Sequence, residues 1–113
     1  MTYQEDLDEA TRLQIEEAEK GKNLKKLSYA PSWRVRAEVA RQGAHLSKLS
    51  NDKDWRVRRE VAKQGYNLNK LVHDRHIMVR LEVARVGFGW KILSNDKELL
   101  MQEELLRLGY KQD

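Results

Sequence analysis

The chain repeats itself every 22 residues, and this period constrains its fold more than any other feature of the sequence. The segment DKDWRVRREVAKQGYNLNKLVH begins at Asp52 and has a near copy before it, APSWRVRAEVARQGAHLSKLSN from Ala30. Another copy, DRHIMVRLEVARVGFGWKILSN, follows from Asp74, and the frame continues loosely from Asp96 and faintly back to Asp8. Self-similarity at so short a period predicts an array in which each unit buries its apolar side against its neighbours.

Each unit is predicted to form one helix of about three turns, then a bend and a short helical turn. In the central copy, Asp54 is a suitable N-cap, because its carboxylate can accept hydrogen bonds from the free N–H groups of the first turn. Gly65 is suited to end the helix, since glycine adopts the left-handed conformation at low cost. An apolar stripe lies between them at helical spacing, formed by Val57, Val61 and Ala62. Leu68 and Leu71 then suit a short turn that packs back on the helix.

Composition favours a single domain over residues 1–113. We expect an N-terminal cap and degenerate repeat over 1–29, three clear repeats over 30–95, and a C-terminal capping repeat over 96–113. The chain contains no cysteine, which excludes a disulfide framework, a thiol nucleophile and a thiolate metal site. It has no apolar run of membrane-spanning length, and its acidic N-terminus lacks a signal-peptide core, so a cytoplasmic protein without membrane contact is expected.

Charge is segregated along the chain although the net charge is only +4. Residues 30–95 hold fourteen Lys and Arg against six Asp and Glu, whereas residues 1–29 and 96–113 each carry two more acidic than basic residues. Asymmetry of this kind bears on the choice of partner and on electrostatic steering rather than on the fold. The three central repeats are therefore the expected contact region for an acidic partner.

One set of charged residues recurs on the apolar side of the helix. Arg58 projects between Val57 and Trp55, so its stem is expected to be partly buried, and a partly buried arginine must be paired. We therefore expect an arginine ladder, in which each arginine bonds carboxylates or carbonyl groups at the seam between units. Its members share two frame positions, Arg36, Arg58 and Arg80 with Asp52, Asp74 and Asp96. Gln102 breaks this series.

Four glutamates also recur at one frame position and form what we call the glutamate row, Glu38, Glu60, Glu82 and Glu104. The helical phase places them near the exposed side, where they are expected to pair with basic groups of neighbouring units. A catalytic carboxylate would not be expected to recur once in every unit.

The repeat signature D-x4-VR-x2-VA-x2-G-x2-L-x2-L runs whole from Asp52 to Leu71, and it recurs with one change over 30–49 and again over 74–93. It resembles the signature of the short α-helical repeats known as leucine-rich repeat variants, and it is also similar to HEAT-like repeats. The resemblance implies an all-α fold, a right-handed α-solenoid of about five 22-residue units. Solenoids of this kind generally offer curved binding surfaces to proteins and sometimes to nucleic acids.

The outward side of the helices carries a predicted basic ridge, made of Arg34, Arg41, Arg56, Arg59, Lys63 and Arg85. Trp33 and Trp55 lie at its edge, where they either pack between units or stack on bases. Towards the C-terminus the same frame positions become apolar, as Met78, Leu81 and Leu100. Contiguous exposed apolar groups often mark a partner interface, although a terminal unit can also tuck such groups under the chain end.

Catalysis and cofactor binding find no support in the sequence. His73 and His76 are only two locally adjacent candidate ligands, and His45 stands one frame earlier, whereas a metal site needs three or four converging ligands. The chain has no glycine-rich phosphate loop, no nucleophile elbow and no paired histidine–carboxylate helix motif. No metal, no cofactor and no enzymatic activity are therefore expected.

The favoured function is a non-enzymatic binding module that engages another protein, with an acidic surface, through the basic ridge and the adjoining apolar residues. One alternative is binding of a nucleic-acid backbone by the same ridge, which would weaken steeply with salt. Another is a small inhibitor of a protein that handles nucleic acids. The chain itself is expected to be a monomer or a weak dimer.

Overall fold

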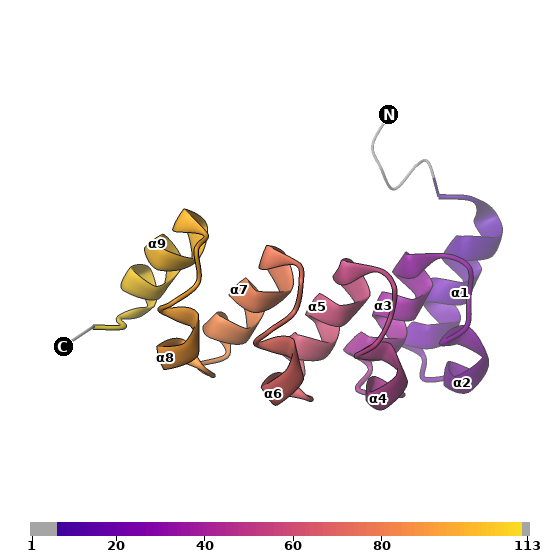
Figure 1. The fold of residues 1–113 in the computed structure, drawn as a ribbon. Coiled ribbons are helices and arrows are strands. Elements are labelled where there is room, and N and C mark those ends of the chain that lie inside the picture. The colour runs from indigo at the N-terminus through magenta and orange to yellow at the C-terminus, as the bar shows by residue number, and fades with distance from the viewer. Residues whose placement is uncertain (1–6, 112–113) are drawn as a thin grey trace.

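The computed structural model of the protein describes residues 7–111, and all the regular structure within that range is helical. Long and short helices alternate along the chain (Figure 1). The long helices are α1 (Glu9–Glu19), α3 (Trp33–Arg41), α5 (Trp55–Lys63), α7 (Ile77–Arg85) and α9 (Leu99–Leu108). The short helices are α2 (Leu24–Leu27), α4 (Leu46–Leu49), α6 (Leu68–Leu71) and α8 (Trp90–Leu93). The predicted all-α class and the predicted pairing of a helix with a short turn are confirmed.

The helices pack in the order of the sequence. Each long helix packs on the next one along the chain, α1 on α3, α3 on α5, α5 on α7 and α7 on α9. The long helices form one row and the short helices a second row beside it (Figure 1). The molecule measures 52 × 33 × 21 Å with a radius of gyration of 15.7 Å, against about 13 Å for a compact domain of this length. The core is therefore a strip along the array rather than a central ball.

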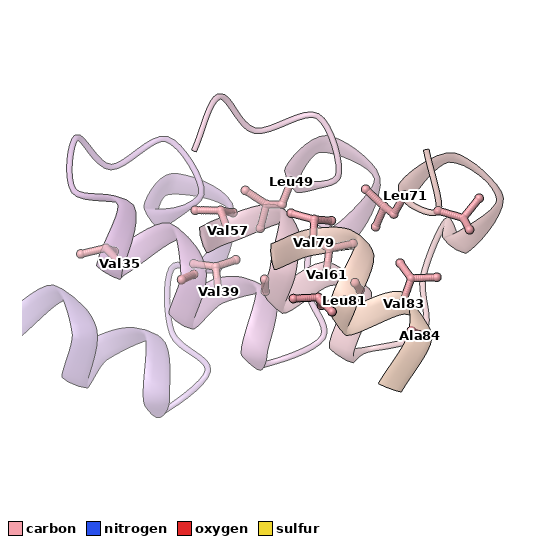
Figure 2. Packing of buried hydrophobic residues seen from close by; sticks show 14 of the residues in the cluster. Val35, Val39, Leu49, Val57, Val61, Leu71, Val79, Leu81, Val83 and Ala84 are labelled. Carbon is pink, nitrogen blue, oxygen red and sulfur yellow. The ribbon is translucent and has the colours of Figure 1, made fainter. Parts of the chain in front are cut away.

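Three frame positions supply much of the buried strip. Val35, Val57 and Val79 are fully buried at one position, and Val39, Val61 and Val83 at a second. The leucine that closes each short helix, such as Leu49 or Leu71, is also fully buried beneath the long helices (Figure 2). Full burial of one such side chain stabilises a fold by about 1.5–3 kcal/mol. Repetition of the same contacts in successive units holds the array together.

The residue before each short helix adopts a left-handed backbone conformation. Asn23, His45 and Asn67 have φ of 54°, 55° and 56°, and Gly89 has 72° at the equivalent position. Asparagine tolerates this conformation well, and glycine adopts it without a steric cost. Gly89 is also required by space, because a Cβ there would lie 2.7 Å from Cγ2 of Val72. This conformation explains why histidine, asparagine and glycine share one frame position.

The starts and ends of the long helices follow the predicted signals. The side chain of Asp54 accepts a hydrogen bond from the backbone N–H of Arg56 at 2.9 Å, which confirms it as the N-cap of α5. Gly65, with φ of 75°, follows the last turn. No helix between residues 7 and 111 has both the length and the apolar character needed to cross a membrane.

Candidate binding surface

The arginine ladder lies at the seams between units. Nη1 of Arg58 donates to the carbonyl oxygen of Asp52 at 2.7 Å, while its Nε and Nη2 donate to the two carboxylate oxygens of Asp74 at 2.8 and 3.0 Å. The side chains of Arg58 and Asp74 are only 4% and 7% exposed. This bidentate geometry fixes the start of one unit against the long helix of the unit before it.

The same bonds recur on either side of that central seam. Arg36 donates to the carboxylate of Asp52 at 2.8 and 3.1 Å, and Arg80 donates to that of Asp96 at 2.7 and 3.4 Å. Each aspartate also accepts a hydrogen bond from the backbone N–H two residues later, so it orders the entry to the next long helix. The ladder residues are thus bound within the fold and are withdrawn from the candidate contact surface.

Two ladder aspartates have perturbed acidity. Burial acts to raise the pKa of Asp74, but the hydrogen bond from Arg58, with that from the N–H of His76, more than offsets it and leaves the pKa below its ordinary value. Burial also acts to raise the pKa of Asp96, but the hydrogen bond from Arg80 outweighs this effect. The pKa of Asp96 is therefore lowered as well. Both carboxylates are therefore held in the ionised form.

Gln102 ends the ladder without leaving a buried charge. Its Nε2 donates to the carbonyl oxygen of Asp96 at 2.6 Å, in the same way that Arg58 donates to the carbonyl of Asp52. A glutamine keeps this bond within the unit and needs no carboxylate from a following unit.

Three of the four residues of the glutamate row are buried, so their expected position near the exposed side was wrong, whereas Glu104 on α9 is partly exposed. Glu38, Glu60 and Glu82 are 7%, 2% and 8% exposed. They lie along the seams between consecutive long helices, where the next helix covers them. Glu60 shows the arrangement, because its carboxylate lies 3.3 Å from Nε of Arg41 in the unit before and 3.4 Å from Nζ of Lys63 in its own unit.

These buried carboxylates compensate half of the predicted basic ridge. Arg41 also bonds Glu38 at 2.6 Å. Arg85 pairs with Glu104 at 2.8 Å and lies 3.8 Å from Glu82. The hydrogen bonds from Arg107 and then Arg85 lower the pKa of Glu104 to about 2. Arg41, Lys63 and Arg85 therefore contribute little excess positive charge to the outer face.

The other ridge residues gather around the two tryptophans. Cζ of Arg56 lies 4.0 Å from the ring centroid of Trp33, and that of Arg34 lies 4.9 Å from it. Arg56 also bonds Asp54 at 2.8 and 3.0 Å, and this hydrogen bond is the main cause of the lowered pKa of the Asp54 carboxyl. Trp33 and its two arginines thus form a half-buried cation–π group at the N-terminal part of the ridge.

Trp55 adopts the first of the two arrangements considered for it, packing between units, and Arg59 lies beside its ring. Trp55 stacks on the ring of His76 with centroids 4.3 Å apart, so one side of its indole ring is covered by the next unit. Cζ of Arg59 lies 5.2 Å from the Trp55 ring, and its Nε is buried with no hydrogen-bond partner among residues 7–111. Packing between units, rather than an open aromatic platform, describes Trp55.

The predicted apolar patch is smaller than expected, because Leu81 lies in the core. Leu81 is 1% exposed and packs among the buried residues in Figure 2. Its frame position is also that of the buried Ala37, so it faces the seam between long helices. Met78 is half-buried, and Leu100 is 50% exposed. Only Met78 and Leu100 remain available at the surface.

The short-helix side carries cations that the sequence analysis did not single out. They share two frame positions and are all exposed, Lys26, Lys48 and Lys70 at one position and Lys53, Arg75 and Lys97 at the other. No ion pair involves them within residues 7–111. Lys48 lies over the ring of Tyr29, and Lys70 donates to the side chain of Asn51, so their close contacts are with neutral groups. In the sequence, these cations are marked only by their recurrence at the 22-residue period of the repeat.

The histidines do not converge. His76 accepts a hydrogen bond from the N–H of Met78 through Nδ1 at 3.1 Å and so caps α7. His73 is exposed, and His45 occupies the left-handed turn position. Among residues 7–111, no three His, Asp or Glu side chains gather closely enough to hold a metal ion.

Comparisons of the chain with protein-family models, with curated proteins and with solved structures each found no match. The likeness to leucine-rich repeat variants and to HEAT-like repeats therefore stays a prediction that rests on the repeat signature.

Proposed function

We propose that the chain is a right-handed α-solenoid of about five 22-residue units that works in the cytoplasm as a non-enzymatic binding module for another protein. The resemblance to leucine-rich repeat variants and HEAT-like repeats implies the handedness, and the 22-residue period suggests the number of units. The stacked helix pairs support the proposal, because such arrays expose a long, regular surface relative to their mass.

The observation that carries the proposal is a single row on the outer edge of the long helices, which we call the contact row, Arg34, Arg56, Met78 and Leu100. One frame position is basic on α3 and α5 and apolar on α7 and α9. A partner that presents an acidic zone beside an apolar one fits this row. Arginine and apolar side chains together are typical of the residues that dominate binding energy at interfaces.

The structure divides the ridge into two classes of cation. Arg34 and Arg56 lie over the ring of Trp33 and Arg59 lies over that of Trp55. Among residues 7–111, these three cations form one ion pair, that of Arg56 with Asp54. Arg41, Lys63 and Arg85 are each tied to buried glutamates. A partner carboxylate that approached the second class would compete with an existing ion pair. We therefore place the contact energy on the contact row rather than on the whole ridge.

The test is affinity capture from a lysate with three forms of the tagged protein. Arg34→Glu/Arg56→Glu reverses two charges in the contact row. Lys48→Glu/Lys70→Glu makes the same charge change on the short-helix side and serves as the matched control. We expect the first pair to lose the captured protein and the second to keep it, with circular dichroism unchanged for both. Equal capture by all three forms would contradict the proposal.

A second candidate function is binding of a nucleic-acid phosphate backbone, and the short-helix cations favour it. Regularly spaced, unpaired cations can track phosphates and give an affinity that falls steeply with salt. This surface differs from the basic ridge, to which the sequence pattern assigns this function. Titration of short DNA and RNA at moderate salt checks it: binding that Lys48→Glu/Lys70→Glu abolishes supports this function, and no saturable binding rejects it.

A further inference from the structure

Side chains of α3 fill the seam between α3 and α5. The indole ring of Trp33 lies against Arg56, whose Cζ is 4.0 Å from the ring centroid. The ladder bond of Arg36 to the carboxylate of Asp52, at 2.8 and 3.1 Å, closes the same seam. Each residue of this set has a counterpart 22 positions earlier, at the seam between α1 and α3, which we call the first seam.

The first seam lacks the large side chains that fill its neighbour. Thr11 stands on α1 where α3 carries Trp33. Gln14 and Ala30 stand at the frame positions of the ladder arginine and the ladder aspartate, and a glutamine and an alanine cannot form that ion pair. The first seam therefore has neither the aromatic ring nor the charged bond of the seam that follows it.

Arg34 is the residue most affected by these replacements. Its counterpart Arg56 lies on the Trp33 ring of the preceding unit and bonds the carboxylate of Asp54 at 2.8 and 3.0 Å. The unit of Arg34 has Ser32 at the frame position of Asp54. Arg34 lies 4.9 Å from the ring of its own unit's Trp33 and forms no ion pair among residues 7–111. It thus lacks both the preceding ring and the carboxylate that Arg56 contacts.

Two adjoining hollows open at the first seam, and together we call them the first-seam hollow. Leu7 lines both of them. The larger has a volume of about 560 Å³ and is lined by Thr11 and Gln14, and the smaller has a volume of about 150 Å³ and is lined by Trp33 and Arg34. A space of about 150 Å³ can hold a benzene ring. The hollow therefore has room for one aromatic side chain where the next seam holds one.

The other charged walls of the first-seam hollow already have partners. Glu38 accepts a hydrogen bond from Arg41 at 2.6 Å, and Asp8 accepts one from the backbone N–H of Thr11 at 2.6 Å. Arg34 is thus the charged wall that can pair with an incoming group. A guanidinium attracts both the face of an aromatic ring and a carboxylate.

We propose that the first-seam hollow binds an aromatic side chain of the protein partner. The ring takes the place beside Arg34 that Trp33 takes beside Arg56, and a neighbouring carboxylate of the partner pairs with Arg34. The site rests on the proposed function and deepens it, because Arg34 is also the first residue of the contact row. The partner then presents an aromatic ring, an acidic zone and an apolar zone, in that order along the array.

The test is a nuclear magnetic resonance titration of the full chain with the peptide acetyl-Asp-Phe-Asp-amide. The peptide acetyl-Asp-Ala-Asp-amide, which has the same charge and no ring, is the matched control. We expect saturable shift changes at the methyl groups of Leu7 and Ile15, which line the hollow, with the first peptide. The second is expected to bind about tenfold more weakly, because it loses the buried ring and its contact with the guanidinium.

Two variants test the place and the charge of the site. Thr11→Trp restores the aromatic residue of the next units, and we expect its own ring to fill the hollow and abolish peptide binding. Leu13→Trp adds the same residue at a 56% exposed position of α1 and is the matched control, which is expected to bind as the unchanged protein does. Arg34→Gln is expected to weaken peptide binding about tenfold. Circular dichroism checks that all three variants are folded.

Several outcomes would overturn the proposal. Among them are the absence of saturable shift changes, equal binding of the two peptides, and full binding by Thr11→Trp. Binding that appears only in a Tyr3→Ala variant would assign the hollow to the chain's own tyrosine and would also overturn it. A captured protein that Arg34→Glu/Arg56→Glu loses and Thr11→Trp keeps would reject this site while the proposed function stands. Peptide binding that Thr11→Trp abolishes supports the site even if Arg34→Glu/Arg56→Glu keeps the captured protein, so the two proposals fail separately.

Discussion

The long-helix side and the short-helix side each present Lys or Arg at frame positions that recur from unit to unit, yet the surroundings of these charges differ. On the long-helix side, buried glutamates compensate Arg41, Lys63 and Arg85. On the short-helix side, Lys48 and Lys70 contact neutral groups. The difference teaches that a repeat reveals where charges recur, whereas only the position of the carboxylates reveals which charges are free.

The largest expected effect comes from breaking the arginine ladder. Arg58→Ala leaves the carboxylate of Asp74 buried without its partner, so we expect the free energy of unfolding to fall by about 3–5 kcal/mol. Chemical denaturation with urea measures this value. Arg56→Ala is the control, because its pair with Asp54 is only half-buried and its loss leaves no fully buried carboxylate unpaired, so it is expected to cost about 1 kcal/mol. Equal losses for the two variants would contradict the account.

Acid is expected to weaken the same seams. The pKa values of Asp74 and Asp96 are lower in the folded state than the ordinary value of about 3.9. Each therefore stabilises the fold fully above about pH 4, and this stabilisation is lost as pH falls through the folded-state pKa. The melting temperature measured between about pH 6 and pH 2 checks this. Asp96→Asn is expected to start from a lower melting temperature and to show a shallower decline, and an identical decline would count against the ladder.

The smallest expected effect comes from the same substitution, lysine to arginine, made once on the long-helix side and once on the short-helix side. Arg41 and Arg85 each reach two glutamates, whereas Lys63 reaches only Glu60. Lys63→Arg is expected to reach Glu82 as well and to stabilise the fold by about 0.5 kcal/mol. Lys70 forms no ion pair among residues 7–111, so Lys70→Arg, the same change on the short-helix side, is expected to be close to neutral. Thermal denaturation of both variants in parallel measures the difference, and equal stabilisation would show that carboxylates do not distinguish the sides.

The repeat period and local capping rules predict much of the fold. The cap at Asp54, the end at Gly65 and the short helix at Leu68–Leu71 are set by residues close in sequence, and the structure has all three. The ion pair of Arg58 at the seam between units could also be predicted, because a buried guanidinium must be paired.

The candidate surface could be predicted only in part. A helical wheel shows the direction of a side chain but not which neighbour covers it, and here each central long helix packs between two others. Glu60 and Leu81 lie on faces that a lone helix would expose, and the adjacent helix buries them. His45 occupies a left-handed turn before a short helix, a backbone conformation that a helical wheel does not reveal. The short-helix cations recur with the same period as the ridge cations, and only the folded arrangement shows that carboxylates pair with the ridge cations Arg41, Lys63 and Arg85.

A nuclear magnetic resonance titration of the full chain with inorganic polyphosphate tests most directly where the free positive charge lies. The account predicts that the largest shift changes centre on the side chains of Lys48, Lys70 and Arg75, and that those of Arg41, Lys63 and Arg85 change little. Shift changes centred on Arg41, Lys63 and Arg85 would contradict the account, because they would show that the buried glutamates leave the ridge charged.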